Sequence, residues 1–223
     1  MSDTLFADPP RFVPPAPPPA APRRFGPADD GAKVSFAEWW DGEFEDGFAA
    51  ELSRGEVLPM EVPNLPHEEI LDRLRTALTL WRVAHPGIVR LISGGLGSRV
   101  PVPPFDSDRH PDLTVYVGEM SGEGRQVWRR NAPAVVCEVL SRGTRSLDEG
   151  PKAEEYLLFG CSEYWLLDPD ARTVRLLVRS GGQWEERPAE EGGLQISETL
   201  AGFTLDPAVL FPAAPPGEPA EHG

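Results

Sequence analysis

Apolar and polar residues alternate along the middle of the chain in a pattern that predicts helices packed on strands. Between Ile70 and Trp81, apolar residues recur at spacings of three and four, which is typical of one buried helix face. Asn64 is a suitable N-cap, glutamates follow in the first turn, and Pro86-Gly87 ends the pattern. The sequence therefore predicts an amphipathic helix over residues 64–84.

Short apolar runs of strand-like composition lie on both sides of this helix. Residues 48–60 predict two strands around Ser53-Arg54-Gly55, a hairpin signal. Helices are predicted at residues 34–46 and 148–159, the second ended by Gly160. The other predicted strands are residues 88–92, 99–102, 112–117, 134–140, 163–167, 173–178 and 183–187. This order predicts an α/β (α+β) fold: a mixed β-sheet flanked by two main helices, with an N-terminal β-hairpin.

Composition divides the chain into three parts. Residues 1–33 and 212–223 are rich in proline and alanine, and such segments bury too little apolar surface to offset the cost of chain ordering. We expect both to be disordered. Residues 34–211 have the length and apolar content of one domain with a single core.

The charge and the absence of long apolar runs restrict the class of protein further. The net charge of −15 argues against a protein that binds DNA through a wholly basic face, although arginines near residues 125–145 allow a local basic strip. Cys137 and Cys161 lie among apolar residues and are expected to be buried free thiols. No apolar run approaches the length of a membrane span, and the N-terminus has no apolar signal core, so we expect a cytoplasmic protein.

Glu138 is the most informative single residue, because it stands inside the apolar strand 134–140. Strand alternation places it on one face with Val136 and Leu140, while Val135 and Val139 face the other way. Burying a polar group without a partner costs roughly 2–7 kcal/mol, and a charge costs more. Glu138 therefore requires a partner, and a metal ion and a lysine are the leading candidates.

Two further residues complete a candidate site. If strands 112–117 and 134–140 pair, Asp112 and Glu138 converge at one sheet edge, where they repel each other unless a cation lies between them. Oxygen ligands suit Mg²⁺ or Mn²⁺, and the backbone carbonyl of Val139 could add a third ligand. Lys152, on the next predicted helix, could lean toward a carboxylate or a phosphate, with Tyr156 one turn later on the same face.

Each of these residues also has a structural interpretation. Asp112 could bond loop amides, Glu138 could pair with Arg142, and Lys152 could be a solvated lysine among neighbouring glutamates.

Three other polar residues are possible accessories to the site. His67 could serve the site or could be a core or capping group. Glu51, in the predicted hairpin, could add a carboxylate, and Asp148 could contribute directly or could shape the loop and cap the helix that follows.

The combined spacing of several short motifs resembles that of the Uma2 family (DUF820) of bacterial restriction-endonuclease-like proteins, in the PD-(D/E)XK nuclease superfamily. The similarity covers roughly residues 36–180. The matching pieces are Glu51-Leu52, Gly55-Glu56, His67, Pro111-Asp112, Glu138-Val139-Leu140-Ser141, Thr144, Asp148, Lys152, Tyr156, Glu163-Tyr164-Trp165 and Asp168-Pro169. In the superfamily a lysine stands two residues after the glutamate. Leu140 occupies that position here, and the family pattern draws its lysine from the following helix, as Lys152.

The resemblance implies a nuclease that uses Mg²⁺ or Mn²⁺ to hydrolyse DNA phosphodiester bonds. Asp112 and Glu138 would hold the ion, and Lys152 would orient water or neutralise charge on the phosphate. A homodimer is expected by analogy, since cutting both strands needs two sites.

Two other functions stay open at this point. The acidic charge and the displaced lysine favour a catalytically silent nuclease-like module that dimerises or binds a partner. A paired-carboxylate glycoside hydrolase is a weaker alternative, because no aromatic cluster for stacking on sugars supports it.

Overall fold

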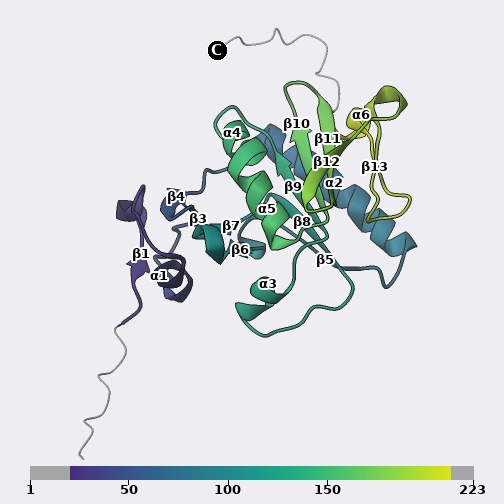
Figure 1. Ribbon diagram of the computed structural model, residues 1–223. Coiled ribbons are helices and arrows are strands. Elements are labelled where there is room, and N and C mark those ends of the chain that lie inside the picture. Colours follow the sequence, from purple (N-terminus) through teal and green to yellow (C-terminus); the bar gives the residue numbers. More distant parts are fainter. Residues whose placement is uncertain (1–20, 212–223) are drawn as a thin grey trace, which may run out of the picture.

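The main body of the protein is a six-stranded mixed sheet with strand order β12-β11-β10-β9-β8-β5. The computed structural model describes residues 21–211, and the predictions for residues 1–20 and 212–223 lie outside the described residues (Figure 1). The strands are β5 (Val89–Ser93), β8 (Leu113–Val117), β9 (Val135–Val139), β10 (Glu163–Asp168), β11 (Thr173–Ser180) and β12 (Gln183–Arg187). Strands β9 and β10 are parallel, and the other neighbours are antiparallel.

One main helix packs on each face of this sheet, as the sequence predicted. Helix α2 (Leu65–Ala84) buries Ile70, Leu74 and Leu78 against the face that carries Val135 and Val139. Helix α5 (Ala153–Phe159) covers the opposite face, where Tyr156 packs near Val136. The alternation predicted for strand 134–140 is confirmed, and it directs Glu138 toward the α5 side.

A second sheet holds the predicted hairpin. Strands β3 (Ala50–Ser53) and β4 (Glu56–Pro59) turn at Arg54 and Gly55, whose φ angles of 49° and 78° suit a tight two-residue hairpin. This small sheet has the order β4-β3-β7-β6, with β6 (Val100–Val102) and β7 (Ser107–Arg109) as its other strands. The sequence did not predict β7, because its residues are polar although they are buried.

The ordered chain begins before the boundary that we expected at residue 33. Strand β1 (Arg24–Phe25) pairs with β2 (Glu43–Phe44), and helix α1 (Phe36–Asp41) follows the capping residue Ser35. Phe25 is fully buried, with its ring centroid 5.1 Å from that of Trp39. The predicted disorder is therefore wrong for residues 21–33, because this segment pairs with β2 and packs Phe25 into an aromatic core.

The second main helix begins earlier than predicted and is not regular. It starts as α4 (Arg145–Leu147), widens into a π-helical turn over Asp148–Lys152, and continues as α5. Pro151 lies inside this turn, where it has no N–H to donate and crowds the preceding carbonyl. Lys152 is therefore the last residue of a helical distortion and does not lie in the first turn of the helix that begins at Arg145.

Short elements account for most of the remaining differences from the sequence prediction. They are α3 (Gln126–Arg130), β13 (Gln195–Ile196), β14 (Thr204–Leu205), α6 (Pro207–Leu210), and 3₁₀ turns at Pro27–Asp29, Gly95–Gly97, Pro103–Phe105 and Glu191–Gly193. Cys137 and Cys161 are buried free thiols, as predicted. Among residues 21–211, none of the helices has the length and apolarity needed to cross a bilayer.

Candidate active site

Asp112 and Glu138 meet where β8 begins and β9 ends. The two strands pair with Leu113 opposite Cys137, which brings the preceding and following residues together. The backbone N–H of Asp112 donates to Glu138 Oε2 at 3.2 Å, and the N–H of Val139 donates to Asp112 Oδ2 at 2.8 Å. The predicted convergence of the two carboxylates is thus present in the structure.

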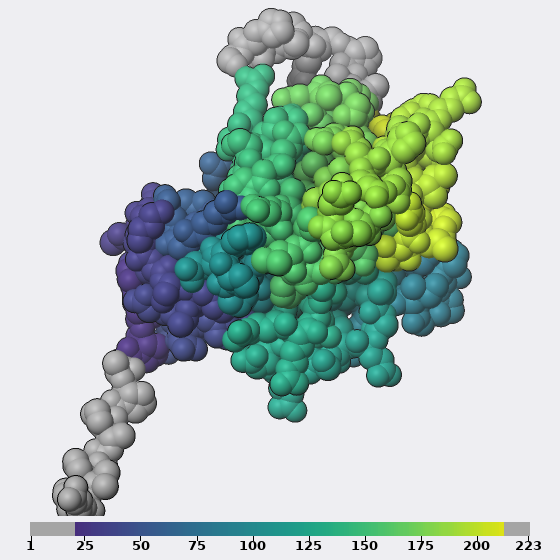
Figure 2. Space-filling view, viewed as in Figure 1, coloured from purple at the N-terminus to yellow at the C-terminus, as the bar shows by residue number. Residues whose placement is uncertain are grey.

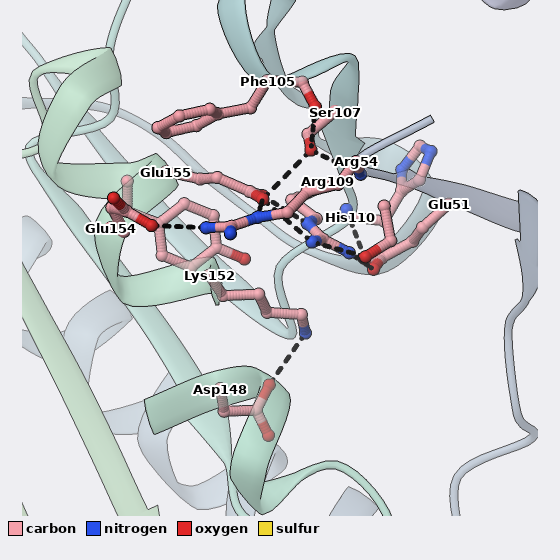
Figure 3. A network of polar contacts seen from close by, with 12 residues as sticks. Glu51, Arg54, Phe105, Ser107, Arg109, His110, Asp148, Lys152, Glu154 and Glu155 are labelled. Atoms are coloured by element: carbon pink, nitrogen blue, oxygen red, sulfur yellow. Dashed lines mark hydrogen bonds and ion pairs between the residues drawn. The ribbon is translucent and has the colours of Figure 1, made fainter. Parts of the chain in front are cut away.

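Lys152 and Tyr156 both reach Glu138 from the helix on the same sheet face. Lys152 Nζ donates to Glu138 Oε1 at 3.0 Å, and the Tyr156 hydroxyl donates to the same oxygen. Lys152 Nζ also lies 2.9 Å from Asp148 Oδ1, an ion pair drawn in Figure 3. Lys152 is only 7% exposed, so the interpretation of a solvated surface lysine is wrong. Asp148 is buried in this ion pair, and its side chain caps no helix end.

His67 reaches the site from the first turn of α2. Its backbone N–H is capped by Asn64, and its Nε2 lies 3.1 Å from Asp112 Oδ2. Its buried Nδ1 has no hydrogen-bond partner among residues 21–211, and Glu68 Oε1 lies 3.8 Å from it. His67 therefore caps nothing through its ring and instead orients one oxygen of Asp112.

Glu51 approaches from β3 and is held by a buried network that the sequence did not predict (Figure 3). It accepts a hydrogen bond from the His110 N–H at 2.6 Å, and Arg109 Nη1 lies 3.4 Å from its other oxygen. Arg109 in turn makes a two-point contact with Glu155 at 2.6 and 3.1 Å. The one sequence signal for this network is that Glu155 follows Lys152 at helical spacing.

The alternative partner for Glu138 is not used. Arg142 is largely exposed and lies 4.0 Å from Asp170, whereas Glu138 is buried against Lys152 and Tyr156.

Burial and the neighbouring charges shift the pKa values of the site residues in opposite directions. Burial raises the pKa of Glu138 well above its usual value, and Lys152 opposes this shift. Burial also opposes the charged form of Lys152, but the surrounding carboxylates raise its pKa well above normal. Burial disfavours the carboxylate of Asp112 too, yet the His67 hydrogen bond and charge hold its pKa below the usual value.

The site has more acids than cations, and this surplus fits a divalent ion. Four carboxylates act on the single ammonium of Lys152: Glu138, Glu51, Asp148 and Asp112. No group of three or more His, Cys, Asp or Glu side chains is arranged as a metal cluster within residues 21–211. Mg²⁺, however, is commonly held by one or two carboxylates with water and substrate completing its shell. The oxygen donors and the excess negative charge therefore suit this ion.

The mixed sheet with one main helix on each face has a restriction-endonuclease-like fold. The model of the Uma2 family, described as "Putative restriction endonuclease", matches residues 35–208, so the chain belongs to the Uma2 family. The resemblance seen in the sequence is confirmed, and it supports a nuclease-like function.

A solved structure agrees with this fold. The chain is similar to the crystal structure of a putative nuclease belonging to DUF820 from Anabaena variabilis ATCC 29413, with a TM-score of 0.63 and 19% identity. The similarity covers 80% of this chain and 97% of that one. No curated protein matches the chain.

Proposed function

We propose that this protein is a Mg²⁺-dependent endonuclease that hydrolyses DNA phosphodiester bonds. The observation that carries the proposal is the meeting of Asp112, Glu138 and Lys152 at one sheet edge, where carboxylates outnumber the ammonium group. Asp112, Glu138 and the backbone carbonyl of Val139 would hold Mg²⁺, and Mn²⁺ could replace it. When bound, the ion would supply Lewis-acid polarisation of the scissile phosphate and a more acidic water.

The protein side chains have separate roles in this proposal. His67 and the Val139 N–H hold Oδ2 of Asp112, while Oδ1 makes no hydrogen bond among residues 21–211 and is left for a ligand. Tyr156 and Lys152 orient Glu138. Lys152, anchored at Asp148, would neutralise charge that grows on the phosphate.

Plasmid nicking with Mg²⁺ or Mn²⁺ tests the proposal. We expect nicking by the wild type to fall at least 100-fold in Glu138→Gln, Asp112→Asn and Lys152→Met, and to stop with chelator. Glu163→Gln is the matched control. Glu163 is also a fully buried carboxylate on a strand of the same sheet, but its partners are Trp165, Ser197 and Thr199.

Two outcomes would overturn the proposal. Equal nicking by the wild type and the site variants would mean that another site or a contaminant cuts the plasmid. No nicking and no calorimetric binding of Mn²⁺ by the wild type would favour the silent nuclease-like module. The homodimer stays a prediction, and light scattering of the purified protein measures it.

A further inference from the structure

Three exposed arginines lie within six consecutive positions at α3, on the surface of an otherwise acidic protein. Arg54, Arg109, Arg145, Arg175 and Arg187 each form an ion pair with a carboxylate. Within residues 21–211, no ion pair to a carboxylate involves Arg125, Arg129 or Arg130, and all three are exposed. In a chain with a net charge of −15, these three exposed guanidinium groups concentrate positive charge at α3. We call these three residues the arginine patch.

Two members of the arginine patch are positioned by the aromatic region around α1. Arg125 Nη1 donates to the backbone carbonyls of Trp40 at 2.7 Å and Gly42 at 3.2 Å. The guanidinium of Arg129 lies over the rings of Trp40 and Phe36, 5.4 and 5.6 Å from their centroids. These contacts use one nitrogen of Arg125 and the ring-facing side of Arg129. The remaining N–H donors of these two guanidinium groups are held in place but form no ion pair with a carboxylate within residues 21–211. Guanidinium donors of this kind suit phosphate oxygens.

The arginine patch and the candidate active site lie on the same side of the main sheet. Thr114 pairs with Val136, so Thr114 and Tyr116 share the face from which Glu138 projects. Trp128 of α3 packs on this face with its ring 5.9 Å from that of Tyr116. Figure 1 shows α3 beside the small sheet and beneath α5, and Figure 2 shows its teal segment as a surface lobe next to the purple N-terminal region.

Strand β8 connects the candidate active site to Tyr116, the residue on which Trp128 of α3 packs. Tyr116 lies four residues along β8 from Asp112, which corresponds to about 14 Å of strand. Phosphates follow one another at about 3.4 Å of rise along one strand of a DNA duplex, so this distance spans about four nucleotides. A duplex cut at Asp112 and Glu138 could then pass over Tyr116 and the adjoining helix α3 within about four nucleotides of the scissile bond.

We propose that Arg125, Arg129 and Arg130 bind the phosphate backbone of duplex DNA on one side of the scissile bond. This inference rests on the proposed nuclease function and identifies the surface that holds the substrate. The arginine patch would supply affinity without base recognition, because contacts to phosphate oxygens carry no sequence information. It also explains how a strongly acidic protein could engage a polyanion through a local positive surface.

Fluorescence anisotropy of a labelled 30-base-pair duplex, in chelator so that no cutting occurs, tests this inference. The variant is Arg129→Gln combined with Arg130→Gln, which leaves the Arg125 contacts to α1 intact. The matched control is Arg75→Gln combined with Arg82→Gln on α2, which removes the same charge from the opposite side of the sheet. Thermal midpoints of all three proteins verify that each is folded.

We expect at least tenfold weaker binding for the patch variant and less than twofold for the control. The slope of log K against log salt should become shallower by about 2 in the patch variant, one unit for each lost phosphate contact. Equal weakening in both variants, or wild-type binding by the patch variant, would overturn the proposal. So would a wild type that binds no duplex, or that binds duplex RNA more tightly than DNA.

The result separates this inference from the proposed function. If the wild type binds DNA through the arginine patch but never nicks a plasmid, the proposed nuclease activity is refuted. The DNA-binding role of the arginine patch is then still supported. If the wild type nicks the plasmid and the patch variant binds and nicks equally well, the DNA-binding role of the arginine patch is refuted. The proposed nuclease activity is then still supported.

Discussion

The buried ion pair between Arg109 and Glu155 offers a quantitative test of how the small sheet is attached to the main body. Arg109 belongs to β7, and Glu155 belongs to α5. Both side chains are fully buried, and Arg109 Nε lies 2.6 Å from Glu155 Oε2. At an effective dielectric constant of about 20, Coulomb's law gives an attraction of roughly 6 kcal/mol at this distance. Desolvation of the two charges offsets much of that attraction.

Removing one partner should therefore cost more than the pair contributes as a whole. In Glu155→Gln, Arg109 stays buried with Glu51 as its remaining acid, 3.4 Å away. We expect the free energy of unfolding to fall by about 3–5 kcal/mol, whereas replacing both residues by methionine should cost less than the sum of the single changes. Urea denaturation followed by tryptophan fluorescence gives each value from the midpoint and slope.

The exposed ion pair between Arg175 and Glu186 provides the control. Its side chains are 39% and 49% exposed, so Glu186→Gln should cost less than about 1 kcal/mol. If Glu155→Gln costs no more than this control, or if the double variant costs the full sum, the pair does not hold the two sheets together as we argue.

Three further predictions concern the metal, the pH dependence and the N-terminal core. Mg²⁺ at ten times its Kd should raise the free energy of unfolding of the wild type by about 1.4 kcal/mol. Glu138→Gln should lose this gain. If Mg²⁺ shifts the thermal midpoint of the wild type and of Glu138→Gln equally in scanning calorimetry, the metal assignment is contradicted. The Arg145 contact lowers the pKa of Asp168, so its stabilisation is complete above the unfolded pKa near 4 and is lost as pH falls through the folded pKa. Asp168→Asn should thus cost up to about 1 kcal/mol at pH 7 and almost nothing at pH 2, whereas a pH-independent cost in urea titrations would exclude a charge effect. Phe25→Ala should cost about 3–5 kcal/mol by leaving a cavity beside Trp39, and a change below 1 kcal/mol in chemical denaturation would show that Phe25 is not part of the core.

Local sequence signals accounted for the elements that position the candidate site. Asn64 and the apolar spacing after it predicted α2, and period-two alternation predicted which face of β9 carries Glu138. The same alternation, with the paired strands, predicted that Asp112 and Glu138 meet. These features depend on neighbours in the chain and on one pairing between adjacent strands, so a single sequence contains enough information for them.

Local sequence signals gave wrong or missing predictions where the burial of a residue depends on partners far away in the sequence. The composition of residues 21–33 predicted disorder, yet Phe25 is buried because β2 and Trp39 provide a surface for it. The polar segment of β7 gave no strand signal, yet Arg109 is buried because Glu155, 46 residues away in the sequence, neutralises it.

The sequence by itself determined the family, the two-helix mixed sheet, and the acids and lysine that form the candidate site. Only the tertiary structure decided that Tyr156, His67 and Asp148 each bond to a member of that set, and that Arg109 and Glu155 support Glu51 beside it. The physical reason is that hydrophobic periodicity acts over a few residues, whereas the partner of a buried charge is fixed by chain topology. A charged residue in the sequence carries no sign of which distant group will compensate it.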